Sequence, residues 1–145
     1  MINNKKHLIV LSSPSGGGKT TLARYLLDNY KQLRFSISAT TRKIRDGEVD
    51  GKDYFFLSID DFKNKIENSE LVEYEQIFGN YYGTLKSEIN KALNNDEFLL
   101  FDVDVKGAIS IKTAYPNDTK LIFISPPSLE ILEQRLRSRS TETEE

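Results

Sequence analysis

Short apolar runs alternate along the chain with segments whose apolar residues recur at helical spacing. Continuous apolar runs are typical of strands buried on both faces, and the recurring pattern is typical of amphipathic helices. Buried strands are predicted at residues 7–12, 97–105 and 120–125. Helices are predicted at 20–29, 59–68, 105–114 and from Ser128 to about Arg137. This alternation predicts an α/β fold with a mainly parallel sheet flanked by helices.

The stretch from residue 35 to residue 94 has a more broken pattern. Short strands are predicted at residues 35–38, 54–57 and 71–78. Residues 40–52 are polar, basic and interrupted by glycine, which predicts a loop. Ser58 is predicted to cap the helix that follows it, and "GNYYGT" (79–84) is predicted to be a turn. Thr84 is predicted to cap the next helix.

The stretch "SSPSGGGKTT" (12–21) lies between a predicted strand and a predicted helix. A glycine loop in this place presents backbone N–H groups and the positive end of a helix to phosphate. The strict pattern G-x-x-x-x-G-K-[ST] fails at Ser13, which stands where its first glycine should be. Lys19 would reach the β- and γ-phosphates, and the Thr20 hydroxyl would bind Mg²⁺. The alternative is a glycine turn that only caps a helix.

The residues predicted to bind ATP are Ser13, Pro14, Ser15, Gly16, Gly17, Gly18, Lys19, Thr20 and Thr21. A further candidate lies in "FDVD" (101–104), where an apolar run ends in two aspartates. In phosphate-loop enzymes an aspartate at the end of a neighbouring strand holds the metal, and Asp102 fits that role, through water. The alternative for Asp102 is a turn former at the end of a strand.

The loop "TTRKIRDGEVDGKDY" (40–54) carries two arginines three positions apart, Arg42 and Arg45, and ends in Tyr54. Two guanidinium groups and a phenol suit the capture of a second phosphate, distinct from that of the nucleoside triphosphate. The alternative is a solvated, charged surface loop.

Composition restricts the class of protein more than it identifies it. The 145 residues suit one domain, and the formal net charge of −2 gives no electrostatic reason to expect nucleic acid as a partner. The chain has no cysteine, which suits a reducing compartment. Its apolar runs are too short to span a membrane, and the N-terminus lacks a signal-peptide core. A cytoplasmic protein, monomer or homodimer, is expected.

Taken together, these segments resemble the guanylate kinase family. The resemblance rests on "SSPSGGGKTT", "FSISATTRKIRDGEVDGKDYFF", "LVEYEQIFGNYYGT", "DVDVKGA", "IFISPPS" and "RLRSRSTETEE", and covers almost the whole chain from His7 onward. It implies a phosphate-loop nucleoside-monophosphate-kinase fold with a small mixed-strand GMP-binding subdomain. It also implies transfer of the γ-phosphoryl group of ATP to GMP, giving ADP and GDP, with Mg²⁺ as cofactor and ATP and GMP as substrates.

The resemblance assigns roles to single residues. It implies that the GMP phosphate is bound by Arg42, Arg45, Tyr54 and Tyr82, and the guanine by Ser38, Glu73 and Thr84. Asp102 and Asp104 would lie near Mg²⁺ and the guanine amino group, with Glu48 as a further candidate. The catalytic set would be Lys19, Arg42, Arg135 and Arg139, of which Arg135 and Arg139 belong to a lid that closes on the ATP phosphates.

The assignment of Glu73 to guanine also agrees with the chemistry of the base. Guanine presents N1–H and N2–H₂ as adjacent donors, and an ionised carboxylate only accepts hydrogen bonds. Adenine presents an acceptor at N1 and has no amino group at C2, so it would leave the carboxylate without partners. The alternative for Glu73 is a surface glutamate in a strand.

The resemblance implies a division into a core (1–34 and 95–128), a GMP-binding subdomain (35–94) and the start of a lid (129–145). Thr141 and Glu144 form a helix start signal, but the chain ends one residue later. Guanylate kinases continue beyond this point, so the chain is expected to be incomplete within the lid. The alternatives are an inactive fragment, a guanylate-kinase-like interaction module without activity, and a kinase of another nucleoside monophosphate.

Overall fold

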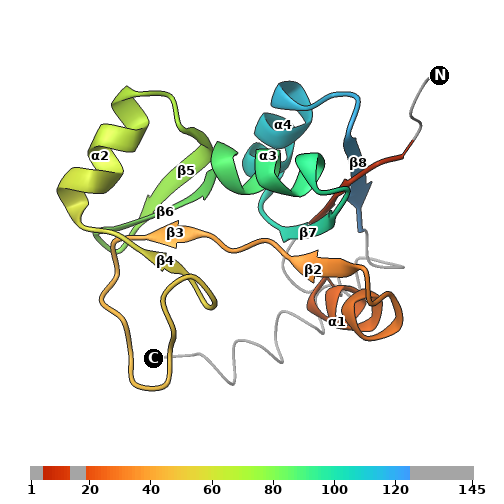
Figure 1. Ribbon diagram of the computed structural model, residues 1–145, viewed down its shortest axis with the longest axis horizontal. Coiled ribbons are helices and arrows are strands. Elements are labelled where there is room, and N and C mark those ends of the chain that lie inside the picture. Colours follow the sequence, from red (N-terminus) through yellow and green to blue (C-terminus); the bar gives the residue numbers. More distant parts are fainter. Residues whose placement is uncertain (1–4, 14–18, 125–145) are drawn as a thin grey trace, which may run out of the picture.

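The computed structural model describes residues 5–13 and 19–124, with only the backbone of Lys19, and these residues form two sheets of four strands each (Figure 1). The first sheet has the strand order β2-β7-β1-β8, and all its neighbouring strands are parallel. Its strands are β1 (Leu8–Ser12), β2 (Leu33–Phe35), β7 (Phe98–Asp102) and β8 (Thr119–Phe123). The predicted α/β fold with a mainly parallel sheet is confirmed.

Helices cover both faces of the first sheet, α1 (Lys19–Asn29) on one and α3 (Lys86–Asn94) with α4 (Val105–Ala114) on the other. Side chains alternate between faces along a strand. Leu100 therefore packs with α1, whereas Leu99 and Phe101 pack with α3 and α4. Because both faces of β1 and β7 exclude water, these two strands are continuous apolar runs in the sequence. The prediction of a buried strand at residues 120–125 is wrong in its burial, since Lys120, Leu121 and Phe123 of β8 are exposed.

The second sheet has the strand order β4-β3-β6-β5 and is antiparallel except between β3 and β4. Its strands are β3 (Ala39–Thr40), β4 (Phe55–Phe56), β5 (Leu71–Ile77) and β6 (Asn80–Leu85). Helix α2 (Ile59–Glu67) packs on it through the fully buried Phe62, and Ser58 caps α2 by accepting a hydrogen bond from the Asp61 N–H at 3.0 Å. The predicted cap at Ser58 is confirmed.

The prediction of a turn at residues 79–84 holds only for Gly79 and is wrong for residues 80–84, which belong to β6. The chain reverses at Phe78 and Gly79, whose φ angles are 49° and 82°, and β6 then pairs with β5 and β3. The predicted cap at Thr84 is also wrong, since Thr84 lies buried in β6 and the N-cap of α3 is Leu85. Pairing with β5 and with the distant β3 outweighs the local preference of Gly and Asn for turns.

Other boundaries differ in detail. The strand predicted at 35–38 is wrong except at Phe35, the last residue of β2, because residues 36–38 connect β2 to β3. The strand predicted at 97–105 ends at Asp102. The helix predicted from Ser128 lies outside the described residues. The division into core, subdomain and lid stays a prediction, although Ile89 and Ala92 of α3, from the predicted 35–94 subdomain, pack in the core of the first sheet.

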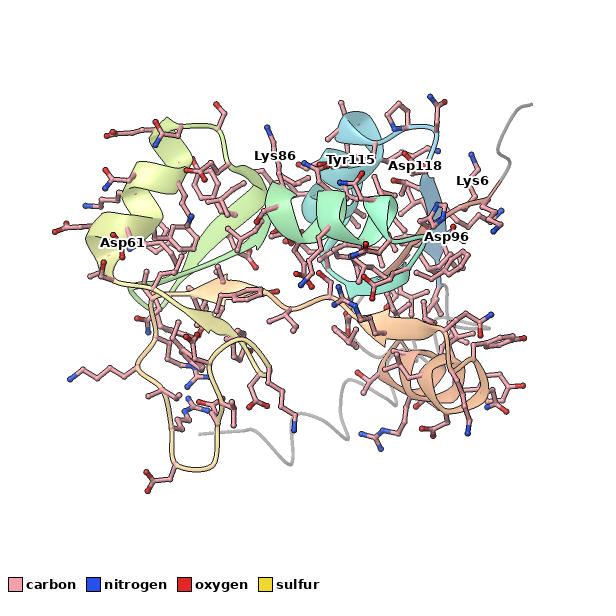
Figure 2. The ribbon with its side chains drawn as sticks, viewed as in Figure 1. Lys6, Asp61, Lys86, Asp96, Tyr115 and Asp118 are labelled. Carbon is pink, nitrogen blue, oxygen red and sulfur yellow. The ribbon has the colours of Figure 1, made fainter. Side chains whose placement is uncertain are left out.

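A polar cluster lies at the amino ends of the parallel strands. His7 Nε2 and Asp96 Oδ1 are hydrogen-bonded at 2.6 Å, and the buried His7 ring stacks on Phe98 at 4.8 Å. Asp96 and Asp118, which precede β7 and β8, lie on the side of the first sheet away from the second (Figure 2). The carboxyl ends of the strands, where ligands bind in parallel sheets, are therefore at the opposite edge. Within the described part of the chain, no helix is long and apolar enough to span a membrane.

We expect Phe62→Ala to lower the free energy of unfolding by about 3–5 kcal/mol, because it removes a buried ring from the second sheet. The Phe62 ring stacks on Tyr81 at 5.1 Å and contacts Gly83, which has no side chain to fill the cavity. Urea denaturation measures the change. Phe78→Ala is the matched control, since Phe78 is fully exposed, and should change stability by less than about 0.5 kcal/mol. Equal losses in the two variants would contradict this role of Phe62.

Candidate functional site

A pocket of ≈ 170 Å³ lies where the second sheet meets the carboxyl end of β7. It receives one wall from β5 and β6 and another from the residues that connect β7 to α4. The lining residues are Ser38, Glu73, Glu75, Tyr82, Gly83, Thr84, Asp102, Val103 and Asp104. The pocket therefore combines groups from both sheets, at the edge where a parallel sheet places its ligands.

Glu73 is a buried carboxylate among the residues that line the pocket. It faces Thr84 across the β5–β6 pair, and the Thr84 hydroxyl donates a hydrogen bond to Glu73 Oε2 at 3.0 Å. Burial raises the pKa of Glu73, the nearby Glu75 and Asp104 carboxylates raise it further, and the Thr84 hydroxyl opposes this change. An ionised Glu73 is thus disfavoured until a ligand offers it hydrogen-bond donors.

Gly107 gives the Glu73 carboxylate its space. A Cβ at this position would lie 2.9 Å from Glu73 Oε1 and 3.2 Å from Asp104 Oδ1, closer than side-chain carbons normally approach oxygen. Asp104 caps α4 here by accepting a hydrogen bond from the Gly107 N–H at 2.7 Å. The first turn of α4 therefore lies directly against Glu73, and its N-terminal end favours negative charge there.

Asp102 connects the pocket with the end of β1. It is the last residue of β7 and pairs with Leu11, and the next N–H, that of Val103, donates to the Leu11 carbonyl at 3.3 Å. Ser13 follows directly after β1, and α1 begins at Lys19. Asp102 thus lies at the same edge of the sheet as the two ends of the glycine loop.

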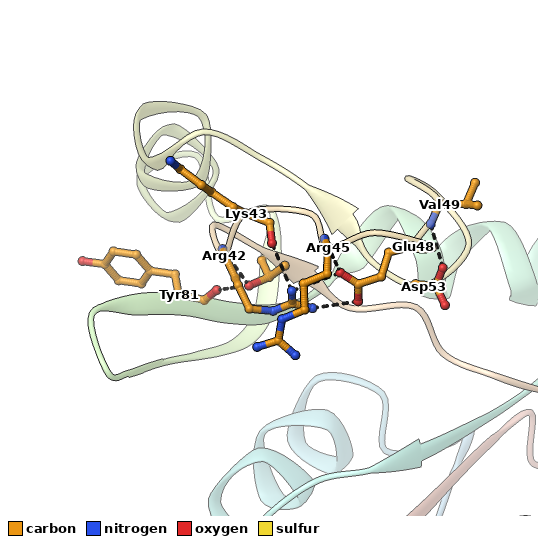
Figure 3. Close-up of polar contacts among 8 residues, drawn as sticks. Arg42, Lys43, Arg45, Glu48, Val49, Asp53 and Tyr81 are labelled. Atoms are coloured by element: carbon orange, nitrogen blue, oxygen red, sulfur yellow. Dashed lines mark hydrogen bonds and ion pairs between the residues drawn. The ribbon is translucent and has the colours of Figure 1, made fainter.

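The loop between β3 and β4 contains a second polar cluster (Figure 3). Arg42 donates from Nη1 to Glu48 Oε1 at 3.0 Å and from Nη2 to Glu48 Oε2 at 2.9 Å. The main-chain N–H of Arg45 donates to Glu48 Oε1 at 2.7 Å. The Glu48 carboxylate raises the pKa of Arg42 above its usual range, and Arg42 and the Arg45 N–H lower the pKa of Glu48. Both side chains of the Arg42–Glu48 pair are charged and mostly shielded from solvent.

Aromatic rings join this loop to the pocket. The Arg42 guanidinium lies 5.2 Å from the centre of the Tyr54 ring and 5.7 Å from that of Phe56. Tyr54 makes an edge contact with Tyr82, with ring centres 6.3 Å apart, and Tyr82 also lines the pocket. One continuous surface therefore runs from a carboxylate-rich pocket to an arginine-rich loop.

Comparison with known proteins assigns the chain to a family. A guanylate kinase family model matches residues 5–145. The chain is 49% identical to the guanylate kinase of Chlorobium luteolum, over 95% of this chain and 70% of that protein. It is 51% identical to that of Rickettsia felis, over 99% of this chain and 74% of that protein. The chain belongs to the guanylate kinase family.

The structural comparison agrees with this assignment. The crystal structure of guanylate kinase from Anaplasma phagocytophilum matches with a TM-score of 0.65 and 32% identity, over 97% of this chain and 71% of that one. A further relative, the guanylate kinase of Maricaulis maris, is 50% identical, and the chain spans 63% of its length. The chain is thus shorter than the guanylate kinases that it matches.

The structure brings most of the predicted guanine-binding and phosphate-binding residues into two neighbouring groups. Those in the pocket are Ser38, Glu73, Tyr82, Thr84, Asp102 and Asp104. Those in or next to the arginine loop are Arg42, Arg45 and Tyr54. Thr20 and Thr21 lie in the first turn of α1. The predicted residues outside the described part of the chain are Pro14, Ser15, Gly16, Gly17, Gly18, Arg135 and Arg139, together with the side chain of Lys19.

Several residues of the site were not found from the sequence. Glu48 was a further candidate near Mg²⁺ and the guanine amino group, but its pairing with Arg42 was not predicted, and it is not among the described residues that line the pocket. Glu75 lies two residues after Glu73, so strand alternation alone places it on the same face. The sequence did not indicate a role for Gly107 or Phe56, because Gly107 lies against Glu73 and Phe56 against Arg42, which are distant in the sequence.

We expect Thr84→Val to raise the pKa of Glu73 further. The variant keeps the shape of Thr84 but removes the hydroxyl, whose hydrogen bond favours the ionised carboxylate. Thr84→Ser, which keeps a hydroxyl, is the matched control and should leave the pKa closer to that of the parent chain. Carbon-13 NMR of the glutamate carboxyls during a pH titration measures both. A pKa of Glu73 that falls or stays constant in Thr84→Val would show that this hydrogen bond does not stabilise the charge.

Proposed function

We propose that the pocket binds the guanine of GMP, that the arginine loop binds its phosphate, and that the chain transfers the γ-phosphoryl group of ATP to GMP. Guanylate kinases are ATP:GMP phosphotransferases, and the chain belongs to their family. The observation that carries the proposal is the hydrogen-bonded Glu73–Thr84 pair that lines the pocket. It supplies acceptor oxygens where a base would enter.

The recognition of guanine follows from donors and acceptors. Guanine N1–H and N2–H₂ would donate to the Glu73 carboxylate, which the Thr84 hydroxyl already orients. These donors also favour the ionised form of Glu73, which burial disfavours in the free chain. Ser38 and Asp104, which line the same pocket, are proposed as further contacts to the base. Adenine would leave Glu73 buried against an acceptor, so it should bind poorly.

The phosphate of GMP would lie at the other end of this surface. Arg42, Arg45, Tyr54 and Tyr82 are the proposed ligands, and the Tyr54–Tyr82 contact connects them to the guanine pocket. Arginine and tyrosine donors would leave one phosphate oxygen to attack the γ-phosphorus of ATP. This arrangement needs no covalent enzyme intermediate, because the chain positions two anions and offsets their charge.

The ATP side of the site is proposed from the sequence and the ends of β1 and β7. Lys19 and the backbone of the glycine loop would bind the ATP phosphates, and Arg135 and Arg139 would close on them. Oxygen ligands suit Mg²⁺, which usually keeps several waters and takes few protein groups. Thr20 directly and Asp102 through water would hold it, and Asp102 lies beside the end of β1. Mg²⁺ would offset charge on the transferred phosphoryl group.

We expect the chain to phosphorylate GMP with a kcat/KM about 10⁴ times that for AMP, because a site built on hydrogen bonds rejects a base that leaves them unpaired. Glu73→Gln should lower kcat/KM for GMP about 100-fold or more, since its amide N–H groups would oppose guanine donors. A coupled assay of ADP formation measures both. Glu67→Gln, on the exposed side of α2, is the matched control and should change neither. Equal rates with GMP and AMP would contradict the proposed recognition of guanine.

A further inference from the structure

Glu48 holds both arginines of the proposed phosphate site, although it lies outside the guanine pocket. Its carboxylate accepts two hydrogen bonds from the Arg42 guanidinium, at 3.0 and 2.9 Å. It accepts a third from the main-chain N–H of Arg45, at 2.7 Å. The Glu48 N–H in turn donates to the Arg45 carbonyl at 3.0 Å, so the two residues are joined in both directions. We propose that Glu48 is a positioning residue, which presents Arg42 and Arg45 to the phosphate of the acceptor nucleotide.

The number of donors on Arg42 supports positioning and not obstruction. A guanidinium has five N–H donors in a fixed plane. Two of them, one on each Nη, form the fork that Glu48 accepts, and Nη1 also donates to the Lys43 carbonyl at 3.0 Å. The N–H of Nε and the second N–H of Nη2 bind neither Glu48 nor Lys43, and they share one edge of the group; the Tyr54 side chain also interacts with the guanidinium. This edge is a two-donor fork of the kind that binds phosphate.

A second constraint acts on the plane of the same guanidinium. The rings of Tyr54 and Phe56 lie against Arg42 at 5.2 and 5.7 Å, while Glu48 accepts at the end of the group. Rings and carboxylate together restrict how the side chain can turn. Since fixing a free arginine side chain on binding costs conformational entropy, an arginine held in advance should bind phosphate more tightly.

Glu48 is also matched to this role by charge. Arg42 and the Arg45 N–H lower the pKa of Glu48, so the carboxylate stays ionised and keeps accepting from the arginine at neutral pH. Glu48 nevertheless offsets only one of the two guanidinium charges in the loop. In Figure 3 the side chains of Arg42 and Arg45 leave the loop on the same side, so the remaining positive charge faces one region.

The loop also contains a matched control for this arrangement. Asp53 accepts a hydrogen bond from the Val49 N–H at 2.7 Å, and the Asp53 N–H donates to the Val49 carbonyl at 3.0 Å. This is the same two-way connection as between Glu48 and Arg45, but without an arginine side chain (Figure 3). Loss of Asp53 therefore reports what loosening the loop does by itself.

The test compares Glu48→Ala, Glu48→Gln and Asp53→Ala in steady-state kinetics with ATP and GMP. We expect both Glu48 variants to raise KM for GMP about tenfold, because the charge-assisted contacts that orient Arg42 are lost, with KM for ATP unchanged. Asp53→Ala should change KM for GMP by less than about twofold. Inhibition by guanosine, which lacks the phosphate, should be the same in all variants. In an Arg42→Ala background, Glu48→Ala should have a smaller effect than in the parent chain, because only its contacts to Arg45 are left to lose.

Four results would overturn the inference. A lower KM for GMP in Glu48→Ala would show that Glu48 competes with the phosphate for Arg42. An equal rise in Asp53→Ala, or weaker guanosine inhibition in the Glu48 variants, would show that Glu48 only maintains the loop. The inference rests on the proposed function, and the two can fail separately. A parent chain that does not phosphorylate GMP contradicts the function, whereas an active parent with unaffected Glu48 variants contradicts only the role of Glu48.

Discussion

The contact between β5 and the first turn of α4 brings the two sheets together, and the pocket depends on it. Glu73 lies at this contact, and Gly107 admits its carboxylate because any Cβ there would stand 2.9 Å from Glu73 Oε1. The same turn is capped by Asp104, which lines the pocket. A substitution that pushed β5 away from α4 would therefore separate the guanine-binding groups from the end of β7, where the metal and ATP are proposed to bind.

The two ends of the site have opposite charge, and this polarity matches a nucleoside monophosphate. Four carboxylates line the pocket, those of Glu73, Glu75, Asp102 and Asp104. Arginines and tyrosines make up the other end, in and beside the loop between β3 and β4. In the proposed orientation of GMP, the guanine donors would face the carboxylates and the phosphate would face the arginines. Binding in the reverse orientation would bring phosphate against carboxylate, so charge alone selects one direction.

Features that arise from short stretches of chain could be predicted from the sequence. β1, α1 and α2 follow local patterns, and the cap of α2 joins Ser58 to the N–H of Asp61, only three residues later. β6 was not predicted, because Asn80 and Gly83 favour turns and the strand is held by pairing with β5 and β3. Thr84 was accordingly assigned to a helix cap, although its role as a guanine-binding residue was expected from the resemblance. Its hydrogen bond to Glu73 depends on the register of β5 against β6, which the local sequence does not reveal.

The arginine loop shows the same limit. Arg42 and Arg45 were identified as candidates because two guanidinium groups and a phenol suit phosphate, and because the loop resembles that of guanylate kinases; the partner of Arg42 was not predicted. Glu48 is six residues from Arg42, and only the folded loop brings the two groups to 2.9 Å.

The most direct test of GMP binding at this site is a crystal structure of the chain with GMP bound. We predict that guanine N1 and the N2 amino group lie within hydrogen-bonding distance of the Glu73 carboxylate, and that Arg42 and Arg45 bind the phosphate. Glu48 should still accept from Arg42 in that structure. A base bound away from Glu73, or a phosphate that contacts neither arginine, would contradict the proposal that this surface binds both the guanine and the phosphate of GMP.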